Sequence, residues 1–190
     1  MSEKSIPYYD FVRKLFNRSG DPSKDFTHAI LGVVTEIHEF MSATDEVNAL
    51  EERGDLRFYV EALGQVISDH AGPFVFSPEA LIVWSKTFAS NCDDTGPAQV
   101  IAHECNELLD EAKRWVGYGK EPKALVATYH RVVSLIEFAN DVGPYQVRGE
   151  NRIIEANMAK LLVRYPGGDF DAFRAVVRDL ESERVALQAS

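Results

Sequence analysis

Two pairs of acidic residues have the spacing that would gather carboxylates at one place. Glu36 and Glu39 form one pair, and Glu52 and Asp55 form the other. Residues three apart on a helix lie on the same face, so each pair presents its carboxylates in one direction. If the two segments form an antiparallel hairpin with a turn at 43–47, Glu39 faces Glu52 and Glu36 faces Asp55. Carboxylates that meet in this way repel one another unless they surround a cation, and hard divalent ions with oxygen ligands are the natural occupants.

Few basic residues balance these acids. Between residues 33 and 56 the chain has seven acidic residues and one Lys or Arg, which is Arg53. An exposed acidic helix usually places Lys or Arg four residues from its acids, because such pairs stabilise it. A solvated helix face, the usual explanation for an acidic pair, is therefore disfavoured here.

The pattern around the acids also directs them toward the core. The face of the second pair continues into an apolar row made of Leu56, Tyr59, Leu63 and Val66. The face of the first pair carries the small residues Ala29, Gly32 and Ala43, which we expect to leave room for a ligand. Because buried unpaired carboxylates are costly, a metal site is the favoured interpretation.

Length, charge and cysteine content restrict the class of protein. The chain has 190 residues and a net charge of −10, so it lacks the basic character that binding to a nucleic-acid polymer requires. Two cysteines, Cys92 and Cys105, give neither a disulfide framework nor a metal-ligand spacing. The polar N-terminus and the lack of an apolar run of membrane-spanning length predict a cytoplasmic protein with no membrane partner.

Helical periodicity runs through nearly the whole chain, and no convincing alternating β pattern interrupts it. Turn-forming residues divide it into segments that we expect to be helices, at 5–17, 25–42, 48–68, 77–89, 99–116, 123–140, 151–165 and 170–187. We expect a loop at 91–97. These segments predict a single all-α domain over residues 1–190, built as a helical bundle. Its parts are a complete acidic hairpin at about 25–68, a second hairpin at about 99–140 and C-terminal helices within 151–187.

The second hairpin is predicted to be a degenerate internal repeat of the first. It carries Glu104 and Glu107 at the spacing of the first acidic pair, whereas Thr128 and Arg131 stand where the second pair would fall. We expect Arg131 to replace the missing ion by pairing with Glu104 or Glu107. This half would then support the bundle rather than bind metal. Chance similarity between two amphipathic hairpins is the alternative explanation.

With these motifs, the chain resembles the all-α nucleoside triphosphate pyrophosphohydrolases of the MazG-like group, which includes the dimeric dUTPases and the phosphoribosyl-ATP pyrophosphohydrolases. The family signature is Glu-x-x-Glu followed by Glu-x-x-Asp, and segments 31–39 and 51–59 resemble its two helices. Segments 107–120 and 155–166 resemble later parts of the family pattern, so the resemblance covers most of residues 8–166. The chain departs from the family in the short gap between its acidic pairs and in its incomplete second hairpin.

The resemblance implies a MazG-like bundle and a reaction. The reaction is hydrolysis of a nucleoside or deoxynucleoside triphosphate between the α and β phosphates, giving monophosphate and pyrophosphate. The resemblance implies Mg²⁺, with Mn²⁺ as a substitute, and one ligand that also positions the attacking water. The implied metal ligands and catalytic residues are Glu36, Glu39, Glu52 and Asp55. The implied substrate-binding residues are Tyr118, Lys120, Asn157, Lys160 and Arg164. The family default is a homodimer, but an internally doubled chain could supply the whole bundle alone.

Two neighbours of the acidic pairs have competing interpretations. Glu51 could position the water, but a solvated acid in the first turn of a helix is the favoured interpretation. Tyr59 could stack on a base, but a core aromatic is favoured at its helical spacing.

Two other functions fit parts of the pattern. A di-iron carboxylate bundle needs Glu-x-x-His motifs on inward faces, and only Asp25-x-x-His28 comes near this pattern. A non-catalytic helical interaction protein on a decayed MazG-like fold would explain the acids that are missing from the second hairpin. It would not explain why the first hairpin keeps all of its acids.

Overall fold

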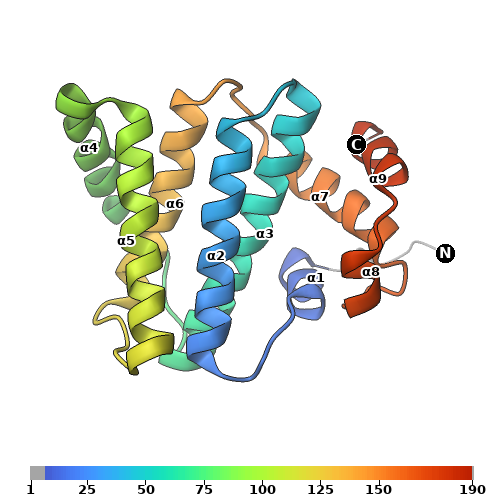
Figure 1. The fold of residues 1–190 in the computed structure, drawn as a ribbon, viewed down its shortest axis with the longest axis horizontal. Coiled ribbons are helices and arrows are strands. Elements are labelled where there is room, and N and C mark those ends of the chain that lie inside the picture. The colour runs from blue at the N-terminus through green and yellow to red at the C-terminus, as the bar shows by residue number, and fades with distance from the viewer. Residues whose placement is uncertain (1–6, 190) are drawn as a thin grey trace.

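The computed structural model describes residues 7–189, which form helices and no strand, and this confirms the all-α class. The helices in chain order are α1 (Tyr8–Leu15), α2 (Pro22–Met41), α3 (Glu46–Ala71), α4 (Pro78–Thr95), α5 (Pro97–Tyr118), α6 (Leu125–Val142), α7 (Glu150–Arg164), α8 (Ala172–Val176) and α9 (Leu180–Gln188) (Figure 1). Residues 5 and 6, the expected start of the first helix, lie outside the described part of the chain.

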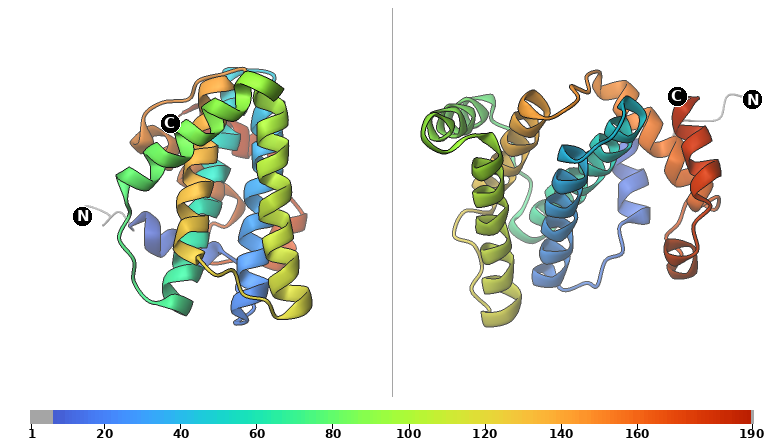
Figure 2. Two further views of the ribbon diagram at one scale, coloured as in Figure 1. Left: turned by 90° about the vertical axis from the view of Figure 1, so that its left-hand side faces the viewer. Right: turned by 45° about the horizontal axis from the view of Figure 1, so that its top comes forward.

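The α2–α3 hairpin stands at the centre of the molecule. Helices α5 and α6 pack against one side of it, with α4 as the outermost helix, while α1 and α7 pack on the other side and α9 packs on α7 (Figures 1 and 2). One continuous apolar core runs from Val12 of α1 through Phe26, Leu63 and Leu135 to Leu187 of α9. The acidic hairpin is therefore held on both sides by packed helices.

Side-chain caps fix the two central helices. Asp21 accepts hydrogen bonds from the backbone N–H groups of Ser23 and Lys24, so α2 begins with Pro22 in its first turn. Asp45 accepts a 2.9 Å hydrogen bond from the backbone N–H of Asn48 and starts α3. Only residues 42–45 connect the two helices, which is close to the expected turn at 43–47. This short connection makes α2 and α3 antiparallel neighbours.

Two expected boundaries are wrong. The expected loop at 91–97 is mostly helical, because α4 continues to Thr95 and ends only at Gly96, whose φ of 84° suits glycine. The expected single helix at 170–187 is divided into α8 and α9. The division lies at Asp179, whose side chain accepts from the backbone N–H of Ser182 and starts a new helix.

The space beside Gly32 is not free for a ligand, contrary to expectation. The aromatic ring of Tyr59 packs directly on Gly32, and a Cβ atom added there would lie 2.3 Å from the ring. Gly32 therefore allows α2 and α3 to approach closely, and it sets the position of Tyr59. The apolar row that contains Tyr59 is inward-facing as expected, with Leu56, Leu63 and Val66 all buried.

Among residues 7–189, none of the helices combines the length and the apolar character needed to cross a lipid bilayer.

We predict that Gly32→Ala lowers the free energy of unfolding by about 1–3 kcal/mol, because the added methyl group overlaps the Tyr59 ring. Gly117→Ala is the matched control. Gly117 is also helical, and no atom lies within 4 Å of its added Cβ, so this change should be neutral or stabilising by up to about 1 kcal/mol. Urea denaturation measures both variants, and equal effects would contradict the close α2–α3 contact.

Candidate active site

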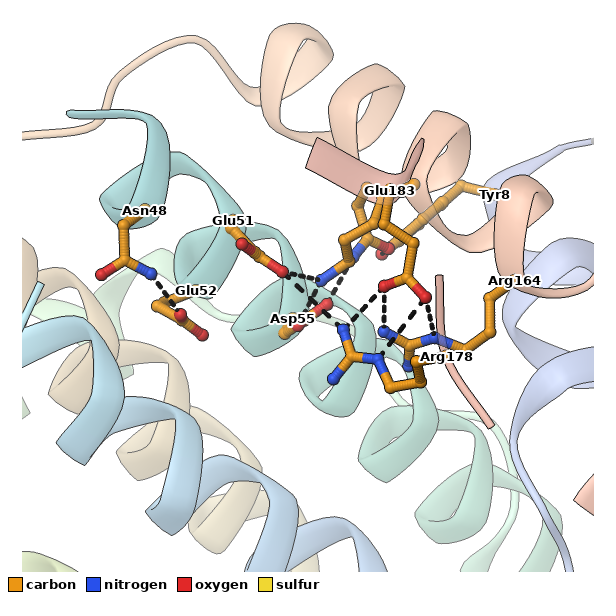
Figure 3. A network of polar contacts seen from close by, with 10 residues as sticks. Tyr8, Asn48, Glu51, Glu52, Asp55, Arg164, Arg178 and Glu183 are labelled. Atoms are coloured by element: carbon orange, nitrogen blue, oxygen red, sulfur yellow. Dashed lines mark hydrogen bonds and ion pairs between the residues drawn. The ribbon is translucent and has the colours of Figure 1, made fainter. Parts of the chain in front are cut away.

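Three carboxylates meet near the α2–α3 turn. Glu36 and Glu39 come from α2 and Glu52 comes from α3, and one oxygen from each lies within 4.8 Å of the others. Glu52 is 7% exposed, and its carboxylate accepts a 2.6 Å hydrogen bond from the side-chain amide of Asn48 (Figure 3). The expected juxtaposition of Glu39 and Glu52 is thus present, and the oxygens are spaced so that one ion could contact several of them.

Asp55 belongs to the same cleft but is engaged by α7. Its carboxylate accepts hydrogen bonds from Lys160 Nζ at 2.5 Å and from the Asn157 side-chain amide at 2.9 Å. Lys160 is 1% exposed, so its ammonium group is a built-in counter-ion for Asp55. The Tyr8 hydroxyl donates to Asn157 Oδ1 at 3.0 Å and orients this amide. Gly54 permits the contact, because a Cβ atom there would lie 3.0 Å from the Asn157 side chain.

Crowding of the acids changes their proton affinity. Burial raises the pKa of Glu36 to about 9, with further contributions from the charges of Asp55, Glu39 and Glu52. Burial likewise raises the pKa of Glu52 to about 7, together with the charges of Asp55, Glu51 and Glu39, and Lys160 opposes both shifts. In the absence of a bound cation the cluster therefore retains protons near neutral pH. An all-carboxylate donor set of this kind fits a hard divalent ion, which would displace those protons.

The acids form one side of a cleft of about 470 Å³. All four implied metal ligands line it, together with Glu51, Arg164 and Arg178. Aromatic residues make up much of the remaining lining, namely Phe16, Phe58, Tyr59, Tyr165 and Phe170. The cleft thus combines a negative wall, two guanidinium groups and apolar rings, which are the surfaces needed by metal ions, phosphates and a base.

A second charge cluster lies at the C-terminal edge of this cleft. The Glu183 carboxylate accepts hydrogen bonds from Arg164 Nε at 3.0 Å and Nη2 at 2.6 Å, and from Arg178 Nη2 at 2.6 Å (Figure 3). Burial alone would raise the pKa of Glu183, but the hydrogen bonds and charges of the two arginines outweigh burial and lower it to about 2. Glu183 is therefore ionised at any physiological pH.

Three members of this edge were not expected from the sequence. Arg178 and Glu183 fall in a segment that has no motif spacing, and only the capping signal of Asp179 marks a break there. The favoured interpretation of Glu51 as a solvated acid is wrong, because it lies 3.4 Å from Lys160 Nζ and 4.0 Å from Arg178 Nη2. These residues come together only through the packing of α9 and α7 near α3.

Tyr118 and Lys120 do not join the cleft, although the family resemblance implied that they bind substrate. Both lie at the far end of α5, away from the α2–α3 turn (Figure 1). Tyr118 is 68% exposed, and Lys120 lines a separate cavity of about 670 Å³ next to Arg131. The reason is the direction of α5, which carries its C-terminal end to the opposite end of the molecule. Asn157, Lys160 and Arg164, by contrast, all contact groups of the acidic cleft or its edge.

The second hairpin holds an arginine among its acids, as expected. Arg131 Nε lies 2.6 Å from Glu104 Oε2, and its Nη1 lies 3.4 Å from Glu111 Oε1. Thr128 donates a 2.9 Å hydrogen bond to Glu111, whereas Glu107 is exposed. Of the two expected partners, Glu104 is the one that forms the ion pair with Arg131. A guanidinium group therefore neutralises the buried acid of this hairpin.

We predict that the chelated protein becomes less stable as pH rises and that divalent ions reverse this loss. The ordinary pKa of Glu is near 4.5, and the folded values of Glu36 and Glu52 are about 9 and about 7. The folded state therefore binds more protons than the unfolded state in this interval, so the free energy of unfolding falls as pH increases. Melting temperatures measured in EDTA between pH 5 and pH 9 should decrease, and the gain from Mg²⁺ or Mn²⁺ should increase with pH. Glu36→Gln should flatten the EDTA profile, and a wild-type profile that is already flat would contradict the assignment.

Comparison of the chain with family models, with curated proteins and with solved structures gave no match. The resemblance to the MazG-like group therefore stays a prediction that is based on the motifs, and the functional argument depends on the geometry of the cleft.

Proposed function

We propose that this protein is a metal-dependent nucleoside triphosphate pyrophosphohydrolase that cleaves a nucleoside or deoxynucleoside triphosphate between the α and β phosphates. The observation that carries this proposal is the arrangement of one cleft. Glu36, Glu39 and Glu52 cluster within 4.8 Å, while Arg164 and Arg178 also line the cleft and the buried Lys160 lies behind it against Asp55. A polyphosphate bound between them would meet metal ions on one side and fixed cations on the other.

The roles follow from the contacts. Glu36, Glu39, Glu52 and Asp55 would hold Mg²⁺, or Mn²⁺ in its place. A bound divalent ion would neutralise phosphate oxygens and lower the pKa of a coordinated water. Asn48 orients Glu52, and Lys160 with Asn157 orients Asp55, so the acids keep their positions before substrate arrives.

The fixed cations and the aromatic wall would bind the rest of the nucleotide. Arg164 would meet the polyphosphate from the edge of the cleft, since it lines the cavity directly. Tyr59, which Gly32 holds in place, lies 5.5 Å from Phe58 between ring centroids, and this aromatic pair offers an apolar surface to a base. The triphosphate is therefore the substrate class that fits both parts of the cleft.

We also propose that the fold of this chain is a MazG-like bundle with a degenerate internal repeat. The α5–α6 hairpin would be the second copy, in which Arg131 replaces the ion and the hairpin supports the active half. A homodimer is the assembly that the family resemblance suggests.

A di-iron carboxylate site is the less favoured alternative. In the part of the chain that the structure describes, the gathered metal-binding side chains are Glu36, Glu39 and Glu52, without a histidine among them. Carboxylate oxygens alone favour Mg²⁺ or Mn²⁺ over the mixed ligands typical of di-iron bundles.

We predict that a panel of nucleoside and deoxynucleoside triphosphates with Mg²⁺ or Mn²⁺ yields monophosphate and pyrophosphate, separated by ion-exchange chromatography. Glu39→Gln and Asp55→Asn should each lower turnover by about 100-fold or more, because each removes a charged ligand. The melting temperature in EDTA should be maintained for Glu39→Gln and should fall for Asp55→Asn, because the buried Lys160 loses its counter-ion. Glu107→Gln, at the matching position of the second hairpin, is the control and should keep full activity.

Other outcomes would contradict the proposal. Release of orthophosphate would place the cleaved bond elsewhere in the triphosphate. Full activity of both Glu39→Gln and Asp55→Asn would show that the acids are not the catalytic centre. Metal-dependent stabilisation with no turnover of any nucleotide would favour the alternative of a non-catalytic helical interaction protein.

A further inference from the structure

Glu183 occupies an unusual position for a carboxylate. It is 2% exposed, yet it touches the edge of a polar cleft through the two arginines that bind it. Arg164 donates a hydrogen bond to each of its carboxylate oxygens, and Arg178 Nη2 donates a further bond of 2.6 Å. Two guanidinium groups that converge on one anion provide the fork geometry that proteins use for phosphate as well as for carboxylate.

The two arginines belong to the cleft and not only to the C-terminal helices. Both line the cavity that contains Glu36, Glu39 and Glu52. Arg178 also lies 4.0 Å from Glu51 (Figure 3). Glu51 in turn contacts the buried Lys160. Arg164 and Arg178 therefore form a pair of guanidinium groups in the cleft lining, with the Glu183 carboxylate bound between them.

The segment that carries Arg178 and Glu183 is attached unevenly, because α9 packs on α7 whereas α8 is exposed. Helix α8 has no buried residue, and its apolar side chains Phe173 and Val176 are 72% and 83% exposed. The buried residues of α9 are Glu183 and Leu187. At the right-hand edge of Figure 1 and of the right panel of Figure 2, α8 and α9 lie outside the central hairpin. The exposed α8 offers little resistance to a shift of Arg178, whereas release of Glu183 has to break its bonds to both arginines.

We propose that Arg164 and Arg178 form a binding site for the terminal phosphate of a polyphosphate, and that Glu183 is an internal occupant which the incoming phosphate displaces. This inference rests on the proposed function only in placing the polyphosphate in the acidic cleft. It adds Arg178 to the substrate-binding residues and makes the position of α9 depend on whether phosphate is bound. The competing explanation is that the ion pairs of Glu183 with Arg164 and Arg178 are permanent and serve only to hold α9 on α7.

Inorganic tripolyphosphate with Mg²⁺ is the probe, measured by isothermal titration calorimetry on the full chain. Glu183→Gln removes the competing charge and should tighten tripolyphosphate binding about tenfold, the factor that corresponds to about 1.4 kcal/mol. Glu181→Gln removes the same charge from an exposed position on the same helix and should leave the affinity unchanged. If the ion pairs of Glu183 are permanent, Glu183→Gln should leave tripolyphosphate binding unchanged or weaken it.

Two further measurements keep the inference testable if Glu183→Gln does not fold. Arg178→Ala removes a partly exposed side chain and should weaken tripolyphosphate binding about tenfold, with little change in melting temperature. In the wild-type protein, hydrogen exchange of the α9 amides should become faster when tripolyphosphate binds, because Glu183 is released. Slower or unchanged exchange would overturn the displacement.

These readouts do not depend on catalysis. If tripolyphosphate binding depends on Glu183 and Arg178 as expected, the inference holds even when no nucleotide is cleaved. If tripolyphosphate fails to bind, or binds equally to the wild type, Glu183→Gln and Arg178→Ala, the inference is wrong even when nucleotide turnover is intact.

Discussion

Repulsion among crowded carboxylates is the constraint that organises this structure. The α2–α3 hairpin brings Glu36, Glu39 and Glu52 together at the wall of the cleft, where Glu52 is buried, Glu36 is half-buried and Glu39 is exposed. Such a cluster is stable only when protons, metal ions or fixed cations balance it. The raised pKa values of Glu36 and Glu52 are the direct expression of this requirement.

The molecule meets the same requirement in different ways at neighbouring places. Asp55 has the ammonium group of Lys160, which is fully buried and delivered by α7. Glu183 has two guanidinium groups, and Glu104 has the guanidinium group of Arg131. Among residues 7–189, no Lys or Arg forms an ion pair with Glu36, Glu39 or Glu52, which distinguishes this group from Asp55, Glu104 and Glu183. This difference supports a mobile cation at that position and fixed cations elsewhere.

Local patterns in the sequence predicted the hairpin and its acids. The three-residue spacings, the apolar row and the capping residues all act within one or two helical turns, so they can be read without knowledge of the fold. The pairing of Arg131 with Glu104 was also accessible, because the expected alignment of the two hairpins placed Arg131 opposite the second acidic pair. In contrast, Tyr118 and Lys120 were assigned to the substrate by family resemblance, and the direction of α5 carries them to the other end of the bundle.

Other features depend on tertiary packing and could not be read from local sequence. Nothing near Gly32 in the sequence indicates that the ring of Tyr59 will fill the space beside it. The contacts among Arg164, Arg178 and Glu183 require that α9 fold back on α7, across a segment that resembles one continuous helix. The position of Glu51 in the cleft also depends on tertiary packing, because its partner Lys160 is supplied by α7.

The Arg131–Glu104 pair has a consequence for how the molecule responds to its surroundings. A guanidinium group is covalently tethered to α6 and keeps its charge, so neither chelators nor dilution can remove it. The half of the bundle formed by α4, α5 and α6 should thus keep its packing whatever the local supply of divalent ions. If the α2–α3 hairpin binds divalent ions as proposed, that half would serve as a fixed template on which the hairpin regains its geometry when the ions exchange with the medium.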